Sequence, residues 1–250
     1  MIASLPMYAT TRTAAADARF WASIRDALRA QGQPAPDTLT PAPGDLLTHW
    51  RDPALVLSQT CGLPYRKVLR DHVMLVGTPD YAVEGCPPGH YCSLVITRSD
   101  DPRTDLAALT QTRFAYNDAM SQSGWAALAL EAPDVLQGPL IQTGSHRASA
   151  MAVRTGQADF ASIDAVTWRH LSASGDTAGL SVIHRTRPTP GLPFIAARCR
   201  DGTVIRQAVS MAIAGLSADD RAILGLRDII ELSPDVYDLP LPPSPQAIGT

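Results

Sequence analysis

Two segments of the sequence place hydroxyl groups and a glycine where a helix is expected to begin. The segment 121–124, with the sequence SQSG, precedes the apolar run 125–130. The segment 143–146, with the sequence TGSH, precedes an amphipathic stretch that ends at Gly156. The first turn of a helix carries backbone N–H groups without intrahelical partners and the positive end of the helix dipole. Two such starts close together would form a binding site for a small oxyanion.

The same residue types also cap helices without binding a ligand, so either segment alone predicts only a helix start. Repetition of the pattern, with His146 directly after Ser145, favours a binding site. By itself, His146 is as consistent with a solvated surface residue as with a residue that donates a hydrogen bond to a ligand. Asp164, which follows the apolar segment 160–163, is open in the same way, because it could cap the next helix or line a ligand site.

The remaining sequence alternates apolar strands with amphipathic helices. Strands are expected at 2–8, 54–58, 72–77, 90–98, 113–117, 139–142, 160–163, 180–186 and 194–199, and helices at 17–31, 44–50, from 164, 203–214 and from 217. This alternation indicates an α/β fold with a largely parallel sheet. Ligands bind beyond the carboxyl ends of strands in such sheets, where Tyr8, Thr60 and Tyr81 are expected. The proline-rich tail after Ser233 is expected to wrap the surface loosely.

Composition bounds the class of protein. The 250 residues are 45% hydrophobic and 18% charged, which suits one large globular domain or two lobes. The net charge of −3 gives no electrostatic footprint for nucleic acid. The sequence predicts neither a transmembrane segment nor a signal peptide. The four cysteines lack CxxC or zinc-ligand spacing, so we expect no metal site and no cofactor.

Four pieces of the chain resemble the phosphate, phosphite and phosphonate substrate-binding proteins of ABC importers. They are QTCGLPY at 59–65, GTPDY with the later GC at 77–86, FAYNDAMSQSG at 114–124, and TGSHRASAMAVRTGQADFASIDAVTW at 143–168. The turn TPGLPF at 189–194 also agrees with this family.

The resemblance implies a two-lobed type II periplasmic-binding-protein-like α/β fold. Mainly parallel sheets flanked by helices would be joined by two hinge strands near Ser93–Arg98 and Ile195–Cys199, with ligand held in the cleft between the lobes. Lobe one would comprise residues 1–97 and 200–250, and lobe two residues 98–199.

The resemblance also implies ligand-binding residues from both lobes. Lobe two would supply Ser121, Ser123, Gly124, Ser145, His146 and Asp164, and lobe one Tyr8, Thr60 and Tyr81. A protonated His146 would add a charge-assisted hydrogen bond, and Asp164 could accept one from a ligand hydroxyl or amine. The expected ligand is a small oxyanion, first a phosphonate or phosphate-like molecule, with sulfonates and carboxylates left open.

The implied partner is an ABC transporter permease. The implied location is the periplasm if a signal sequence has been removed or lies upstream, and the cytoplasm otherwise. A disulfide between Cys61 and Cys86 is implied as well; it would close a loop of about 25 residues, stabilise the fold by roughly 3 kcal/mol, and indicate an oxidising compartment. The alternative is two thiols in a reducing cytoplasm.

Two other functions stay open. An enzyme on the same fold could use Cys61 as nucleophile and His146 as base. A cytoplasmic module could sense a ligand in the same cleft. We expect a binding protein and not an enzyme, because the sequence holds no nucleophile elbow and no set of metal ligands.

Overall fold

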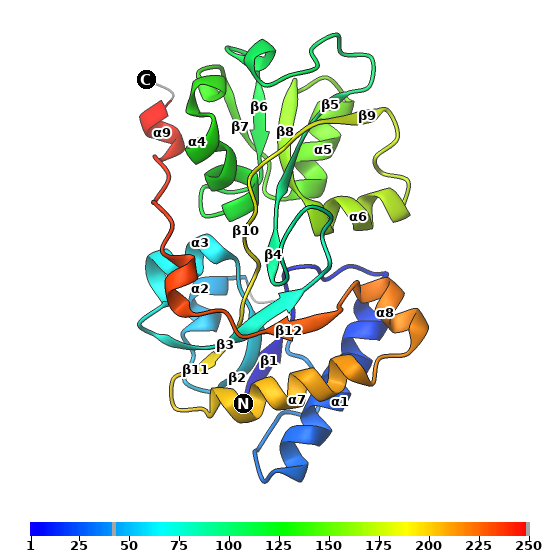
Figure 1. The fold of residues 1–250 in the computed structure, drawn as a ribbon, viewed down its shortest axis with the longest axis vertical. Helices are drawn as coiled ribbons and strands as arrows, with labels where there is room; N and C mark the ends of the chain where they lie inside the picture. The colour runs from blue at the N-terminus through cyan, green and yellow to red at the C-terminus, as the bar shows by residue number, and fades with distance from the viewer. Residues whose placement is uncertain (42–43, 249–250) are drawn as a thin grey trace. The chain divides into compact units, whose positions relative to one another are not determined.

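The computed structural model describes residues 1–41 and 44–248, which form two compact units (Figure 1). The first unit comprises Met1–Gly89 and Pro190–Leu239, and the second comprises His90–Thr189 with the segment from Pro240 onward. The chain therefore passes between the units three times. The division expected from the sequence sets the first two boundaries later, at 97/98 and 199/200, and assigns the C-terminal tail wholly to the first unit.

The sheet of the first unit has three strands that run in the same direction. In spatial order the strands are β1 (Ile2–Ser4), β2 (Leu55–Gln59), β11 (Phe194–Ala197), β3 (Val73–Asp80) and β12 (Asp228–Ile230). β1 pairs in parallel with β2, β11 is antiparallel to both β2 and β3, and β12 is antiparallel to β3. The carboxyl ends of β2 and β3 therefore meet at one edge of the sheet.

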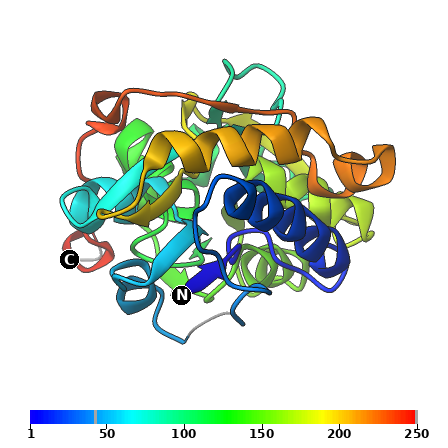
Figure 2. The same ribbon diagram turned by 90° about the horizontal axis from the view of Figure 1, so that it is seen from below.

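The helices of the first unit surround this sheet. They are α1 (Ala14–Ala30), α2 (Leu46–Trp50), α3 (Gly62–Pro64), the π-helical turn η1 (Tyr65–Leu69), α7 (Gly202–Ala214), α8 (Ala218–Leu224) and the 3-10 turn η5 (Pro234–Tyr237). Of these, α2 and α7 pack directly on the strands of the sheet. Trp21, Ile24 and Leu28 recur at helical spacing along α1 and are buried. α1 and α7 lie side by side (Figure 2).

The sheet of the second unit carries the helix starts of interest. Its spatial order is β7 (Leu140–Gln142), β6 (Phe114–Tyr116), β8 (Phe160–Asp164), β5 (Ser93–Arg98) and β9 (Leu180–Arg185). β6 is parallel to β7 and β8, so these three strands end at one edge. Each leads into a helix: the π-helical turn η3 (Gln122–Ala126) with α4 (Ala127–Glu131), α5 (His146–Arg154) and α6 (Ala165–Ala173). The short elements η2 (Ala107–Leu109), η4 (Pro133–Leu136) and α9 (Pro245–Ile248) complete the unit.

The two segments expected to act as hinges are instead central sheet strands. Ser93–Arg98 forms β5 between β8 and β9, and most of Ile195–Cys199 belongs to β11 between β2 and β3. Their apolar runs are buried, as central strands require. Each sheet is consequently mixed, with β5, β11 and β12 running against the other strands. The first two passages between the units instead fall at the paired short strands β4 (His90–Tyr91) and β10 (Thr189–Pro190).

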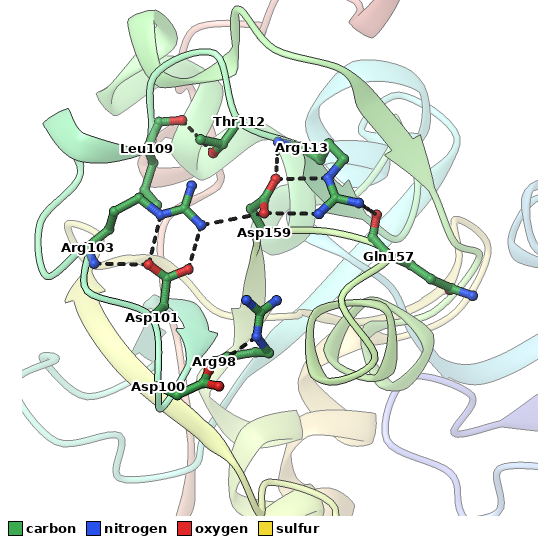
Figure 3. A network of polar contacts seen from close by, with 9 residues as sticks. All are labelled: Arg98, Asp100, Asp101, Arg103, Leu109, Thr112, Arg113, Gln157 and Asp159. Atoms are coloured by element: carbon green, nitrogen blue, oxygen red, sulfur yellow. Dashed lines mark hydrogen bonds and ion pairs between the residues drawn. The ribbon is translucent and has the colours of Figure 1, made fainter.

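A polar network holds the starts of β6 and β8 together (Figure 3). Asp159, just before β8, accepts hydrogen bonds from the Arg113 guanidinium at 2.9 and 3.1 Å and from the Arg113 backbone N–H at 2.9 Å. Arg103, held by Asp101, reaches the same carboxylate at 3.4 Å. The network fixes the register of the two strands at the edge opposite to the helix starts.

The C-terminal tail is fixed, contrary to the loose wrapping expected from its prolines. Tyr237 is buried in the first unit, where its hydroxyl lies 2.7 Å from Thr78 Oγ1 and donates to the Gly191 carbonyl at 3.0 Å. Farther on, Pro245 is buried in the second unit. No helix within residues 1–41 and 44–248 is long and apolar enough to cross a membrane.

Candidate functional site

Both predicted serine motifs cap helices that begin at the same edge of the second sheet. Ser121 Oγ accepts a hydrogen bond from the Gly124 N–H at 3.0 Å, and Ser145 Oγ accepts one from the Ala148 N–H at 3.1 Å. A hydroxyl that accepts in this way keeps its own proton for a further hydrogen bond. Ser121 is buried, whereas Ser145 is exposed. The two segments are therefore helix caps that can still donate to a ligand.

Asp164 caps the third helix start. Its Oδ1 accepts hydrogen bonds from the backbone N–H groups of Val166 and Thr167, at 2.7 and 2.8 Å. The residue is buried, and the sequence had left the capping and ligand roles open. The structure shows the capping role, which one carboxylate oxygen performs.

The helix starts are joined through one contact between side chains. Ser123 Oγ, in η3, lies 2.9 Å from Nε2 of His146, the first residue of α5. Ser162, on β8, donates its hydroxyl hydrogen bond to the Ser123 carbonyl at 2.7 Å. Residues from η3, α5 and β8 thus form one connected cluster, and the two motifs that the sequence predicted to converge do converge.

His146 is neutral at physiological pH. Burial lowers its pKa from 6.5 to about 4, and the nearby backbone of Ser162 opposes the shift only weakly. The sequence analysis noted that a protonated His146 would add a charge-assisted hydrogen bond; the lowered pKa disfavours that form, because burial removes the hydration of a charged ring. If Nε2 carries the proton, it donates to Ser123 Oγ, and the Ser123 hydroxyl stays available as a donor.

Asn117 belongs to this cluster, although the sequence reasoning did not select it. A Cβ atom on Gly124 would lie 1.7 Å from Asn117 Oδ1 and 3.2 Å from the His146 ring, so only glycine fits at position 124. Within the described residues, Asn117 Oδ1 is a buried oxygen without a hydrogen-bond partner. The Asn117 carbonyl also accepts from the Gly144 N–H at 2.9 Å. The position of Asn117 directly after the strand β6 was the sequence signal that could have identified this residue.

The other three predicted residues lie in the first unit. Thr60 directly follows β2, and Tyr81 directly follows β3. The rings of Tyr8 and Tyr81 meet edge to face with centroids 5.1 Å apart. Gln59 Nε2 donates to the Tyr81 hydroxyl at 3.1 Å, which fixes the orientation of that ring. Thr60 is buried, and its N–H donates to the Pro193 carbonyl at 3.0 Å.

The disulfide implied between Cys61 and Cys86 is not formed in the structure, where both residues are half-buried thiols. Both residues lie in the first unit, Cys61 after β2 and Cys86 after β3. Of the pair named in the enzyme hypothesis, Cys61 belongs to the first unit and His146 to the second, where it contacts Ser123.

A cavity of about 1080 Å³ lies in the first unit, but none of the predicted ligand residues lines it. It is bounded by the start of β3 and by the segment 198–203, at the opposite end of β3 from Tyr81. Within the described parts of the chain, no three His, Cys, Asp or Glu side chains gather in a metal-binding arrangement.

Solved structures with the same fold cover nearly the whole chain. The binding component of an ABC phosphonate transporter from Pseudomonas aeruginosa has a TM-score of 0.70 at 16% identity, covering 95% of this chain and 82% of that one. PhnD1 from Prochlorococcus marinus, in complex with methylphosphonate, has a TM-score of 0.68 at 14% identity, covering 95% and 94%. A Xanthomonas citri protein bound to ATP has a TM-score of 0.68 at 14% identity, covering 99% and 94%.

These likenesses define the class: the chain has the two-lobed periplasmic binding protein fold, with helices flanking mixed sheets. The family model of periplasmic substrate-binding proteins of phosphonate ABC transporters matches residues 57–234. The chain belongs to this family, which confirms the resemblance seen in the sequence. The matched range includes every predicted ligand residue except Tyr8. The curated proteins contain no match to the sequence.

Proposed function

We propose that this protein reversibly captures a small phosphonate in the periplasm and delivers it to an ABC transporter permease. The observation that supports the proposal most directly is the hydrogen bond between Ser123 and His146, which connects two helix starts in one cluster of neutral donors. Family membership supports the substrate class, and the methylphosphonate bound to PhnD1 supplies a first ligand to test.

The proposed recognition in the second unit uses neutral groups and helix ends. The hydroxyls of Ser121, Ser123 and Ser145 would donate to the oxygens of the ligand. The Gly124 N–H already donates to Ser121, so its role would be to allow close approach of the backbone. At α5, the backbone N–H groups of the first turn and the helix dipole favour an anion. With His146 neutral, this cluster attracts phosphonate through dipoles and hydrogen bonds.

In the proposal, Asp164 determines which phosphonates the cluster binds best. Its carboxylate caps α6 through Oδ1, and because a carboxylate can accept several hydrogen bonds it would also accept one from an amine or a protonated oxygen on the ligand. A buried carboxylate near an oxyanion would otherwise repel it, so Asp164 favours a ligand that brings such a proton. Monoprotonated and aminoalkyl phosphonates meet this condition.

The first unit would complete the proposed site with Tyr8, Thr60 and Tyr81. The two tyrosines combine hydroxyl donors with aromatic surface, which suits the organic group of a phosphonate. The bond from Gln59 holds Tyr81 in place before ligand arrives, so less conformational freedom is lost on binding. The proposed function assigns no catalytic residue to the chain.

A ligand panel tests this proposal. Thermal unfolding would be followed with methylphosphonate, 2-aminoethylphosphonate, phosphite, phosphate, methanesulfonate and acetate, for the native protein and for Ser123→Ala combined with His146→Ala. A ligand at a hundred times its Kd stabilises the native state by about 2.7 kcal/mol, which raises Tm by several degrees. Ser172→Ala, at an exposed position of α6, is the matched control.

We expect a phosphonate to shift the native protein and the control but not the double variant. A panel in which no phosphorus oxyanion shifts the native protein would contradict the proposal. A shift by methylphosphonate that persists unchanged in the double variant would instead show that the ligand binds away from Ser123 and His146.

A further inference from the structure

The C-terminal segment packs on the second unit against the residue that follows Gly124. The indole Nε1–H of Trp125 donates to the carbonyl oxygen of Pro243 at 2.9 Å. Trp125 is 0% exposed, and Ile248 packs against the same hydrophobic core that contains it. The tail thus covers a side chain of η3, the helical turn that carries Ser123.

Trp125 is held on several sides. Its ring lies 5.1 Å from that of Tyr116 and 6.3 Å from that of Phe114, measured between centroids, and both partners belong to β6. The hydrogen bond to Pro243 then satisfies the buried indole N–H, which would otherwise lack a partner in an apolar core. The tail therefore determines how deeply, and in which orientation, Trp125 is seated.

The orientation of Trp125 matters because η3 is a π-helical turn. The Ala126 N–H donates to the Ser121 carbonyl at 3.0 Å, five residues back instead of four. Isolated π-turns are uncommon and need support from surrounding structure. Each residue of an α-helix turns the chain by about 100°, because there are 3.6 residues per turn. If η3 lost its extra residue and became α-helical, the residues before it would therefore rotate by about 100° relative to those after it. Ser123 would then leave His146, and Gly124 would leave Asn117.

We propose that the contact between Trp125 and Pro243 makes the C-terminal tail a positioning element of the phosphonate site, with Trp125 as the positioning residue. The inference rests on the proposed function for its ligand. The tail touches Trp125 and the core, and Ser123 and Gly124 receive its effect through the register of η3. Residues 118 positions apart in the sequence are thereby coupled within one unit.

Two variants test the contact from its two sides. Trp125→Phe keeps an aromatic ring in the core but removes the indole donor. Ile248→Glu places a charge in a partly buried position and should release the end of the tail. Leu241→Glu is the matched control, since this leucine belongs to the same tail but is 57% exposed. The Kd for methylphosphonate would be measured by calorimetry at a temperature where circular dichroism shows every variant folded.

Hydrogen exchange provides a readout that does not depend on ligand. Both test variants should weaken methylphosphonate binding at least fivefold and accelerate amide exchange in residues 121–127 at least tenfold. Exchange in β3 of the first unit should stay unchanged, as should every property of Leu241→Glu. Faster exchange spread over the whole chain would indicate only general destabilisation and would overturn the inference.

The remaining outcomes also decide the question. Unchanged exchange at 121–127 in both variants overturns the inference, and so does faster local exchange with an unchanged Kd. If the native protein binds no methylphosphonate, the proposed ligand is wrong, and the exchange rates at 121–127 alone then decide whether the tail fixes η3.

Discussion

Asp159 accepts three hydrogen bonds from Arg113, one from its backbone N–H and two from its guanidinium. The two residues stand just before β8 and β6, so this bidentate pair aligns the starts of two adjacent parallel strands. The hydrogen bonds from Arg113 lower the pKa of Asp159 to about 2, although partial burial acts against the shift. The carboxylate is thus more acidic in the folded protein than in the unfolded chain.

Asp159→Asn should destabilise the protein by about 1 to 2 kcal/mol at pH 7, because the charged acceptor is lost while Arg113 stays in place. A lowered pKa stabilises the fold above the ordinary value near 4, and this contribution disappears as pH falls toward 2. Urea unfolding at pH 7 and at pH 2.5 measures the difference. Asp100→Asn, at an ion pair whose carboxylate side chain is 81% exposed, should change stability by less than about 0.5 kcal/mol. Equal effects of the two substitutions would contradict the role of Asp159.

His146 should make the protein less stable in mild acid. Its pKa falls from 6.5 to about 4 on folding, so the unfolded chain binds the proton more readily between these values. Stability is therefore complete above pH 6.5 and declines as pH drops toward 4, by up to about 3 kcal/mol for this group. His146→Asn should flatten that slope in urea unfolding from pH 7.5 to 4.5. A slope in His146→Asn as steep as that of the native protein would refute the prediction.

Gly124→Ala should disrupt the site sterically. The added methyl would lie 1.7 Å from Asn117 Oδ1, which cannot be accommodated without moving Asn117 or η3. We expect a loss of about 1 to 3 kcal/mol in stability and at least a tenfold weaker phosphonate affinity. Pairing it with Asn117→Ala should recover part of the stability. Gly44→Ala, where an added Cβ meets nothing within 4 Å, is the control; a Gly124 variant as stable as this control would show that the loop adapts freely.

Asp17→Asn should stabilise the protein at neutral pH. Burial raises the pKa of Asp17 to about 6, against the effect of a hydrogen bond from Thr13, so the ionised form is disfavoured in the folded state. A raised carboxyl pKa means that stability is greatest below the ordinary value near 4 and is lost as pH rises through 6. The neutral amide should gain about 1 to 3 kcal/mol at pH 7.5 and little at pH 4. Asp26→Asn, at an exposed position of the same helix, should show no such gain.

The local elements were predictable because their signals are local. The SQSG and TGSH segments do begin helices, and alternating apolar strands do form the two sheets. The resemblance of four motifs was enough to identify the family that the model match confirms. The repetition of the motif after two strands was enough to predict that the helix starts converge, whereas the contact between Ser123 and His146 was not predicted.

Features that depend on distant parts of the chain were not predictable in the same way. A buried apolar run such as Ser93–Arg98 has the same composition whether it links two units or forms a central strand, so its partners decide. The charge of His146 depends on how deeply the ring is buried, which residue types do not reveal. Asn117 and Pro243 gain their roles from Gly124 and Trp125, through contacts that no local pattern encodes.

The third passage between the units has a practical consequence for measuring their motion. Because the chain enters the second unit again at Pro240, β1 belongs to one unit and α9 to the other. A fluorescent donor near Ile2 and an acceptor at the exposed Gln246 of α9 would therefore report the distance between the units. Energy transfer between the two dyes, followed during titration with methylphosphonate, would measure whether the distance between the units changes when the ligand binds.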